Sequence, residues 1–304
     1  MVIALLHSMV TAGTPILFAA LGEIFTERSG ILNLGVEGVM LIGALCGFAA
    51  ALSFSNPWLG VLAAICAGAL VGLMFGVLCI GFQVDQAIAG IALTTFGIGF
   101  SGFLGKPFLG KLLTNSFKEI NLPVLGNIPI IGKIFFNQDA LVYISYILVP
   151  ILWYIIFRTR PGLHLRSVGE NPRAADTLGI SVVRTRYIYT MIGCMLGAVG
   201  GAYITLAYVP TWLEHITTGR GWIAVSLVIF AGWNPIMAML GSYLFGGIDA
   251  ATLYIQAAGT EIPSNLLGMA PYIITILTLV VATLIRHGGQ GPSALGRPYN
   301  SEEQ

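Results

Sequence analysis

The chain has 304 residues, of which 56% are hydrophobic and only 9% are charged, and its formal net charge is +1. A soluble domain carries about 25% charged residues, so this composition excludes an ordinary soluble protein and predicts a polytopic membrane protein. The small net charge gives no reason to expect nucleic acid as a partner.

Apolar stretches that could span a bilayer recur along the whole sequence. A bilayer core needs about 20 apolar residues per helix. On that basis we predict an all-α, polytopic transmembrane helical bundle that forms a single domain over residues 1–304. The predicted count is nine spans, or ten if one polar-interrupted segment is split. The nine are residues 2–24, 31–54, 58–82, 86–105, 141–157, 187–209, 214–233, 235–259 and 266–285.

The longest polar stretch between two spans is residues 158–186, which holds six of the fourteen Lys and Arg against two acids. By the positive-inside rule this loop lies in the cytoplasm. Counting spans from it places Met1 and the loop 106–140 outside, and the polar tail 286–304 inside. The outer loop is itself basic, so its charge does not support this assignment. We expect the tail to be disordered or to lie against the inner surface.

A short helix is predicted within the basic loop. Asn171 is a good N-cap, Pro172 suits the first helical position, and Gly179 supplies a stop. Two interpretations are open. The loop is either a solvated segment whose arginines set topology, or it presents a docking helix to a cytoplasmic partner.

Polar residues within the spans are candidates for function. Asn33 and Glu37 share one helix face, and an ionisable group at that depth usually faces a cavity or a partner. Alternatively, Glu37 caps its own span at the inner interface. Thr94 and Thr95 either line a pathway or bond back to their own helix. Asp249 is open to the same two kinds of interpretation.

Glycines mark the helix contacts that we expect. The runs Gly68-x-x-x-Gly72-x-x-x-Gly76 and Gly193-x-x-x-Gly197-x-x-x-Gly201 predict close helix packing. Residues 232–235, Gly-Trp-Asn-Pro, must break a helix. A similarity between residues 90–96 and 221–230 hints at an internal repeat, which is common among transporters.

Catalytic, metal and cofactor sites are not expected. Residues 105–112 nearly match the phosphate-binding loop G-x-x-x-x-G-K-[ST], but Leu112 replaces the Ser/Thr and Pro107 interrupts the loop. The four histidines are scattered, and the four cysteines lack metal-site spacing. No nucleophile elbow or close carboxylate pair is present, so we do not expect an enzyme.

Three segments occur in an order that resembles a known family. They are Glu-Arg-Ser-Gly-Ile-Leu-Asn-Leu-Gly-Val-Glu-Gly at 27–38, Gly-Glu-Asn-Pro-Arg-Ala-Ala at 169–175 with Gly179-Ile180, and Gly-Trp-Asn-Pro at 232–235. Over nearly the whole chain these resemble the inner-membrane permeases of ABC importers for branched-chain amino acids, ribose and related sugars. The first segment is most similar to the nucleoside and simple-sugar branch. Asn33-Leu-Gly replaces the acidic turn usual in the sugar branch, which argues against ribose itself.

The resemblance implies a multi-pass inner-membrane transport subunit that imports nucleosides or simple sugars. The partners it implies are a separate cytoplasmic ATPase, a second permease chain (identical or different), an extracytoplasmic substrate-binding protein and a small-molecule substrate. The family's coupling helix maps to Gly169, Glu170, Asn171, Pro172, Arg173, Ala174, Ala175, Asp176 and Gly179. The family's substrate pathway maps to the spans that hold Asn33, Glu37, Thr94 and Thr95.

Two alternatives to this function are kept. One is a permease for branched-chain amino acids or other sugars. The other is an ion-coupled secondary transporter, for which Glu37 and Asp249 are the only plausible ionisable residues within the spans.

Overall fold

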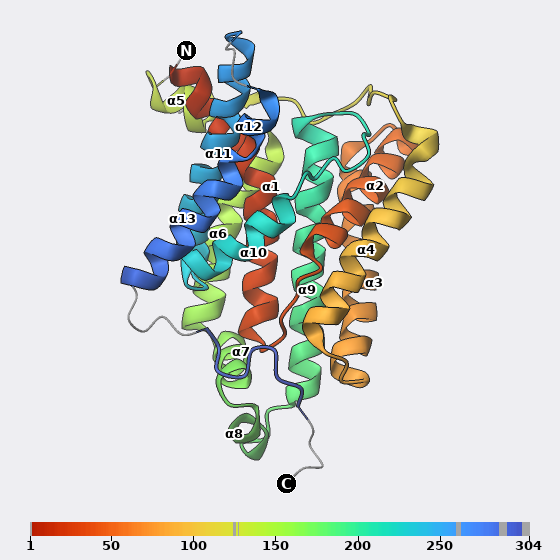
Figure 1. Ribbon diagram of the computed structural model, residues 1–304, viewed down its shortest axis with the longest axis vertical. Helices are drawn as coiled ribbons and strands as arrows, with labels where there is room; N and C mark the ends of the chain where they lie inside the picture. Colours follow the sequence, from red (N-terminus) through yellow and green to blue (C-terminus); the bar gives the residue numbers. More distant parts are fainter. Residues whose placement is uncertain (1, 124–125, 127, 260–262, 286–290, 300–304) are drawn as a thin grey trace.

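A computed structural model describes residues 2–123, 126, 128–259, 263–285 and 291–299 as an elongated helical bundle (Figure 1). Seven helices of this described part are long and apolar enough to cross a membrane. They are α1 (Val2–Arg28), α2 (Val36–Phe54), α3 (Pro57–Gly76, extended by a π turn, Val77–Gly81), α4 (Gln86–Gly105, extended by a 3-10 turn, Lys106–Phe108), α6 (Ala140–Arg158), α9 (Val182–Tyr203, extended by a π turn, Ile204–Tyr208) and α11 (Pro235–Ala257). Two shorter apolar helices, α10 (Arg220–Ala231) and α13 (Ala270–Ile285), complete the bundle. The predicted all-α transmembrane fold is confirmed.

Short elements lie at the two ends of the bundle. The helices α5 (Ile131–Phe135) and α12 (Ser264–Gly268) lie near the N-terminus, as does the antiparallel pair of β1 (Ile120–Asn121) and β2 (Asn137–Gln138). At the opposite end lie α7 (Arg160–Glu170), α8 (Pro172–Thr177) and residues 291–299 (Figure 1). The loop 106–140 and the basic loop 158–186 therefore lie at opposite ends, as predicted. Following the positive-inside rule, we name the end with the basic loop the cytoplasmic end and the other end the outer end.

Two halves of the bundle are built alike but run in opposite directions. The helices α1, α2, α3 and α4 correspond to α9, α10, α11 and α13, since α11 packs along α1 as α3 packs along α9. Between the halves, α1 and α9 pack directly on each other. The repeat suggested by the sequence is therefore present, but the match of residues 90–96 to 221–230 is wrong, because α10 corresponds to α2 and not to α4.

Both α2 and α10 begin only after a non-helical segment. The predicted span 31–54 becomes helical at Val36, and the predicted span 214–233 contains a helix of 12 residues. At 1.5 Å per residue that helix is about 18 Å long, short of a hydrocarbon core of about 30 Å. Continuous helices at these two places were a wrong prediction. The positive φ angles of Gly30 (89°) and Gly219 (79°) keep the chain out of the helix there.

The predicted glycine contacts are confirmed. A Cβ atom on Gly68 would lie 2.6 Å from the carbonyl oxygen of Cys194, in α9. One on Gly193 would lie 2.7 Å from the carbonyl oxygen of Gly22, in α1. Close backbone approach therefore allows α9 to pack between α1 and α3.

Candidate functional site: two mid-bundle breaks and a cytoplasmic coupling end

The first break, residues 29–35, is a non-helical segment that passes through the bundle between α1 and α2. Backbone groups within a membrane must be satisfied by the protein itself. Side chains do this here through four hydrogen bonds: Leu32 N to Gln86 Oε1 (2.7 Å), Asn33 N to Glu23 Oε1 (3.3 Å), Gly35 N to Asn33 Oδ1 (2.9 Å) and Thr94 Oγ1 to the Leu34 oxygen (3.2 Å). Polar residues in neighbouring spans thus hold this segment in its extended form.

The second break, residues 209–219, ends where α10 begins, and the Glu37 side chain from α2 binds it there. Its Oε1 accepts hydrogen bonds from the Gly219 N–H (2.9 Å) and the Thr217 hydroxyl, and its Oε2 accepts one from the Gly221 N–H (2.7 Å). A carboxylate at a helix N-terminus also meets the positive end of the helix dipole. A Cβ on Gly221 would lie 2.5 Å from the Glu37 Cα, so the first turns of α2 and α10 touch backbone to backbone.

The four predicted pathway residues fall into two groups. Asn33, Glu37 and Thr94 are buried and bonded at the breaks. Thr95 lies on the exposed face of α4, where its hydroxyl donates to the Ile91 oxygen at 3.1 Å. Glu37 does cap a helix, but that helix is α10 and not its own.

The predicted helix in the basic loop is confirmed as α8. The Asn171 side chain accepts a hydrogen bond from the Ala174 N–H (3.1 Å), and Gly179 has a φ of 82° at the C-terminal stop. Ala175 is buried against Val168 and Val182, and fixes the helix to α7 and α9. The opposite face of α8 is exposed, with Arg173 and Ala174 on the helix and Leu178 just after it.

The helix α7, which precedes α8, was not predicted. Thr159 caps it by accepting a hydrogen bond from the Gly162 N–H (3.3 Å), and Pro161 lies in its first turn. The N-cap residue and the proline are both visible in the sequence, but the segment was predicted to be a loop because it is highly charged.

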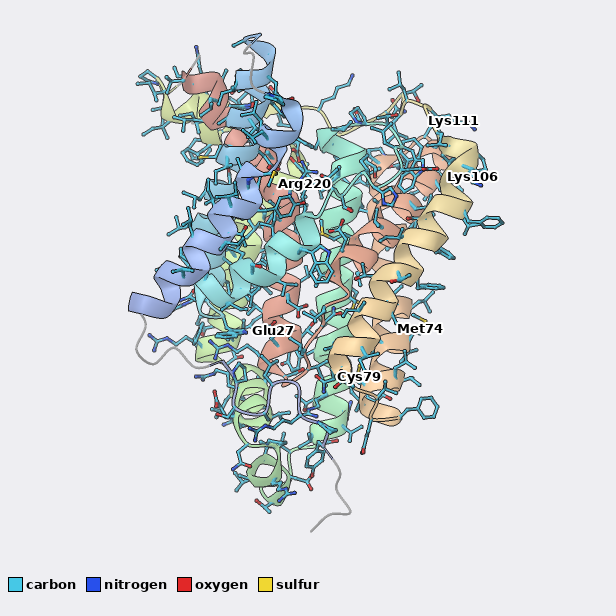
Figure 2. The ribbon with its side chains drawn as sticks, viewed as in Figure 1. Glu27, Met74, Cys79, Lys106, Lys111 and Arg220 are labelled. Carbon is cyan, nitrogen blue, oxygen red and sulfur yellow. The ribbon has the colours of Figure 1, made fainter. Side chains whose placement is uncertain are left out.

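Residues from the three distinctive sequence segments meet at the cytoplasmic end, in a cluster that we name the cytoplasmic junction: Glu27, Arg28, Gly169 and Trp233. The Trp233 indole N–H donates to the Glu27 carboxylate, and the Arg28 guanidinium donates to the Trp233 oxygen at 3.1 Å. A Cβ on Gly169 would lie 2.2 Å from the Arg28 oxygen. Figure 2 shows Glu27 in this half of the bundle. Nothing in the three sequence segments, taken one at a time, predicts that they contact one another.

The described part of the tail binds the same end. Residues 291–299 hydrogen-bond several other segments: Ser293 Oγ to Glu170 Oε2 (2.8 Å), Ala294 N to the Gly169 oxygen (2.9 Å), Gly296 N to the Gly30 oxygen (3.2 Å), Arg186 to the Arg297 oxygen (3.2 Å) and Gln83 to the Tyr299 oxygen (3.2 Å). Residues 291–299 therefore pack against the same end of the bundle as the basic loop. The remaining tail residues, 286–290 and 300–304, lie outside the described part of the chain.

Comparison with known proteins identifies this arrangement. Residues 5–285 match the family described as the permease component of a branched-chain amino acid transport system. The chain belongs to this family. It is a multi-pass membrane protein and a permease component of an ABC transport system.

Three curated relatives align with this permease over almost their whole length. It is 40% identical to the nucleoside ABC transporter permease NupC of Lactococcus lactis, with 90% of each chain covered. It is 38% identical to the guanosine ABC transporter permease NupQ of Bacillus subtilis, covering 94% of this chain and 92% of the relative. A third relative, TsgC13 of Haloferax volcanii, is named as a candidate glucose ABC transporter permease and is 36% identical over 98% of both chains.

Within the permease, α8 and the tail enclose a cleft of about 470 Å³. Its polar lining comes from both segments: Glu170, Asn171, Arg173, Ser293, Arg297 and Tyr299. Burial, a hydrogen bond to Asp176 and the charge of that carboxylate raise the pKa of the Tyr299 phenol, against the opposing charges of Arg173 and Arg186. The cytoplasmic end therefore presents a charged, hollowed surface with α8 at its edge.

Proposed function

We propose that this permease imports nucleosides, with simple sugars as the second candidate substrate. The alignment over about nine tenths of NupC and NupQ carries the proposal, because both names assign nucleoside substrates. The relative named for glucose supports the sugar alternative. Both substrates are small, neutral and rich in hydroxyl groups.

A separate ATPase subunit would drive the transport through the coupling residues Gly169, Glu170, Asn171, Pro172, Arg173, Ala174, Ala175, Asp176 and Gly179. The exposed face of α8 is suited to a groove in such a subunit, and Ala175 anchors the helix behind that face. Gly169 abuts α1 at the cytoplasmic junction, so a displaced α8 would push on the helix that leads into the first break. In this proposal residues 1–304 act as one domain, 158–186 as its cytoplasmic coupling loop and 286–304 as a polar C-terminal tail.

The substrate pathway would form against a second permease chain, identical or different. Thr95 lies on an exposed face of α4 that is available to such a chain. The buried side chains of Asn33, Glu37 and Thr94 would act indirectly, because their hydrogen bonds stabilise the conformation of the two breaks. A ligand drives such a rearrangement only through its different affinities for the two states.

The outer end offers a surface for an extracytoplasmic substrate-binding protein. A cavity of about 770 Å³ opens there between α1, α5 and the loop between α4 and α6. At its edge His7 lies 3.8 Å from Glu119, and His7 also bonds the Asn137 oxygen at 2.8 Å. Polar groups of both signs at this edge suit a protein that binds and releases repeatedly.

Competition uptake tests the substrate. Cells that carry the transporter and its partners take up radiolabelled guanosine in the presence of an excess of other nucleosides, glucose, ribose or leucine. We expect nucleosides to compete strongly and leucine not to compete. Competition by leucine alone would overturn the proposal, and competition by glucose alone would favour the second candidate. Uptake that persists without ATP and follows an ion gradient would instead indicate a secondary transporter.

A further inference from the structure

A polar cavity of about 340 Å³ opens between α10, α11 and α13, beside the end of the second break, since Thr218 lines it. Figure 2 shows Arg220, on its wall, nearer the outer end than Glu27. Small-molecule sites have volumes of about 300–1,000 Å³, so a single sugar or nucleoside is of the right scale for this space. Its polar lining residues are Thr218, Arg220, Asp249, Thr252, Gln256 and Tyr272.

The cavity contains an ion pair between Arg220 and Asp249 with a long separation. One guanidinium nitrogen of Arg220 lies 3.4 Å from Asp249 Oδ2, and the two side chains are 12% and 17% exposed. Among the described residues, the Asp249 carboxylate has no other hydrogen bond, and the buried Arg220 Nε has none at all. Each charge therefore keeps unused capacity for hydrogen bonds toward the cavity.

Arg220 also holds the second break, since its Nη1 donates to the Thr218 hydroxyl at 2.9 Å and to the Thr217 and Ile216 oxygens at 3.4 and 3.5 Å, but no such contact explains the Asp249 carboxylate. The N-terminus of α10 is already capped by Glu37, which accepts from Gly219 and Gly221. Arg220 is the first residue of α10, where a positive charge is unfavourable to the helix dipole. Ionisable residues within a membrane are costly, and their usual explanation is function.

An aromatic wall completes the cavity. The Tyr272 hydroxyl donates to the Thr218 oxygen at 2.8 Å, which fixes the phenol ring on α13 beside the start of α10. Tyr208, which does not line the cavity, lies with its ring centre 5.5 Å from the Arg220 guanidinium, so Tyr272 is the aromatic residue of the cavity lining. Aromatic faces pack well against the apolar faces of sugar and base rings.

We propose that this cavity binds the hydroxyl-bearing ring of the substrate on its way through the permease. The inference rests on the proposed function. Vicinal hydroxyls donate to the free capacity of the Asp249 carboxylate and accept from Arg220, and these charge-assisted bonds are strong where water is excluded. A ribose or a pyranose carries such a pair of hydroxyls, and a branched-chain amino acid does not. The cavity thereby selects substrates by their hydroxyl groups.

Removal of the substrate's hydroxyls tests this site. The transporter, reconstituted in proteoliposomes with its ATPase and binding protein, takes up guanosine and 2′,3′-dideoxyguanosine, and the ratio of the two initial rates is measured. The binding protein is the same in every sample, so its own selectivity cancels between variants. Asp249→Asn should lower the ratio about tenfold, the effect of losing hydrogen bonds to a charged group, while dideoxyguanosine uptake stays within about twofold. Asp85→Asn, which retains an N-cap at an exposed position of α4, is the matched control and should leave the ratio unchanged.

An unchanged ratio in Asp249→Asn, or an equal loss for both substrates, would overturn the proposed site. If the Asp249→Asn protein does not insert into the membrane, Asp249→Glu is measured in its place. This variant keeps the negative charge but moves the carboxylate, so the ratio of the guanosine rate to the dideoxyguanosine rate must still change. If the wild type imports glucose and no nucleoside, the proposed substrate is wrong, and the comparison is made with glucose and 2,3-dideoxyglucose, which has no vicinal hydroxyls, by the same criterion. If the wild type imports only branched-chain amino acids, both proposals fail.

Discussion

The mid-bundle breaks and the cytoplasmic end both concentrate polar residues, but they use them in opposite ways. At the breaks, Asn33 and Glu37 are buried, and their side chains bind backbone groups of the same chain. At the cytoplasmic end, Arg173 and its neighbours are exposed around an open cleft. A polar group within the bilayer must find its partner in the fold, whereas one in water is free to serve another protein. The predictions below test this difference.

The largest effect is expected at α8. Arg173→Glu combined with Asp176→Arg reverses the charge pattern of the helix without changing its net charge. We expect substrate uptake and co-purification of the ATPase to be lost, while the amount of inserted permease stays normal. Lys111→Glu, at the outer end, should retain ATPase co-purification. Wild-type uptake by the double variant would show that α8 is not the docking helix.

Glu37 tests whether the breaks depend on their buried carboxylate. Glu37→Ala removes the acceptor of three hydrogen bonds at the start of α10. Each such bond to a charged group contributes about 1.5–3 kcal/mol, so we expect a loss of at least about 3 kcal/mol in the free energy of unfolding. Thermal unfolding in detergent measures it.

The matched control is Glu119→Ala, which removes the pair of His7 and Glu119 at the surface. The expected loss in the free energy of unfolding is under about 1 kcal/mol. Glu37→Gln keeps an acceptor oxygen and should fall between the two. If the Tm of Glu37→Ala equals that of the wild type, the breaks do not depend on this cap.

Gly169 connects the two regions. In Gly169→Ala the new methyl group would meet the Arg28 oxygen at 2.2 Å, so α7 must move away from α1. Such overpacking costs about 1–3 kcal/mol. We expect a lower Tm and a reduced uptake rate at normal expression. Gly99→Ala is the control for stability, because its methyl group meets open space; an equal loss in the two variants would contradict the proposed contact.

The smallest effect is expected at the cap of α8. Asn171→Ala removes the acceptor of the Ala174 N–H, which should cost about 1 kcal/mol of local helix stability. Hydrogen exchange at residues 172–177 should become faster, and the rest of the bundle should not change. Asn171→Asp keeps the acceptor and should exchange like the wild type. Equal exchange in Asn171→Ala would mean that packing of Ala175 alone holds the helix.

Several features were predictable because they depend on neighbouring residues. Span positions follow from runs of apolar residues, and α8 follows from Asn171, Pro172 and Gly179. The helix α7 was missed, although Thr159 and Pro161 mark its start, because a polar segment was assumed to be a loop. The break before α10 was missed although Glu214, His215 and Gly219 mark it, because the apolar run 221–231 was extended backwards to the length of a span.

The sequence alone determined that this chain is a helical membrane protein, that its longest polar loop is basic, and where α8 begins and ends. Hydrophobicity, loop charge and helix capping act over short distances along the chain, so they can be read from it. Only the tertiary structure decided that Glu37 caps α10, that Trp233 joins Glu27 at the cytoplasmic junction, and that Arg220 and Asp249 share a cavity. These pairs are separated by up to 206 residues. Their contacts depend on how the two inverted halves pack, which no local pattern specifies.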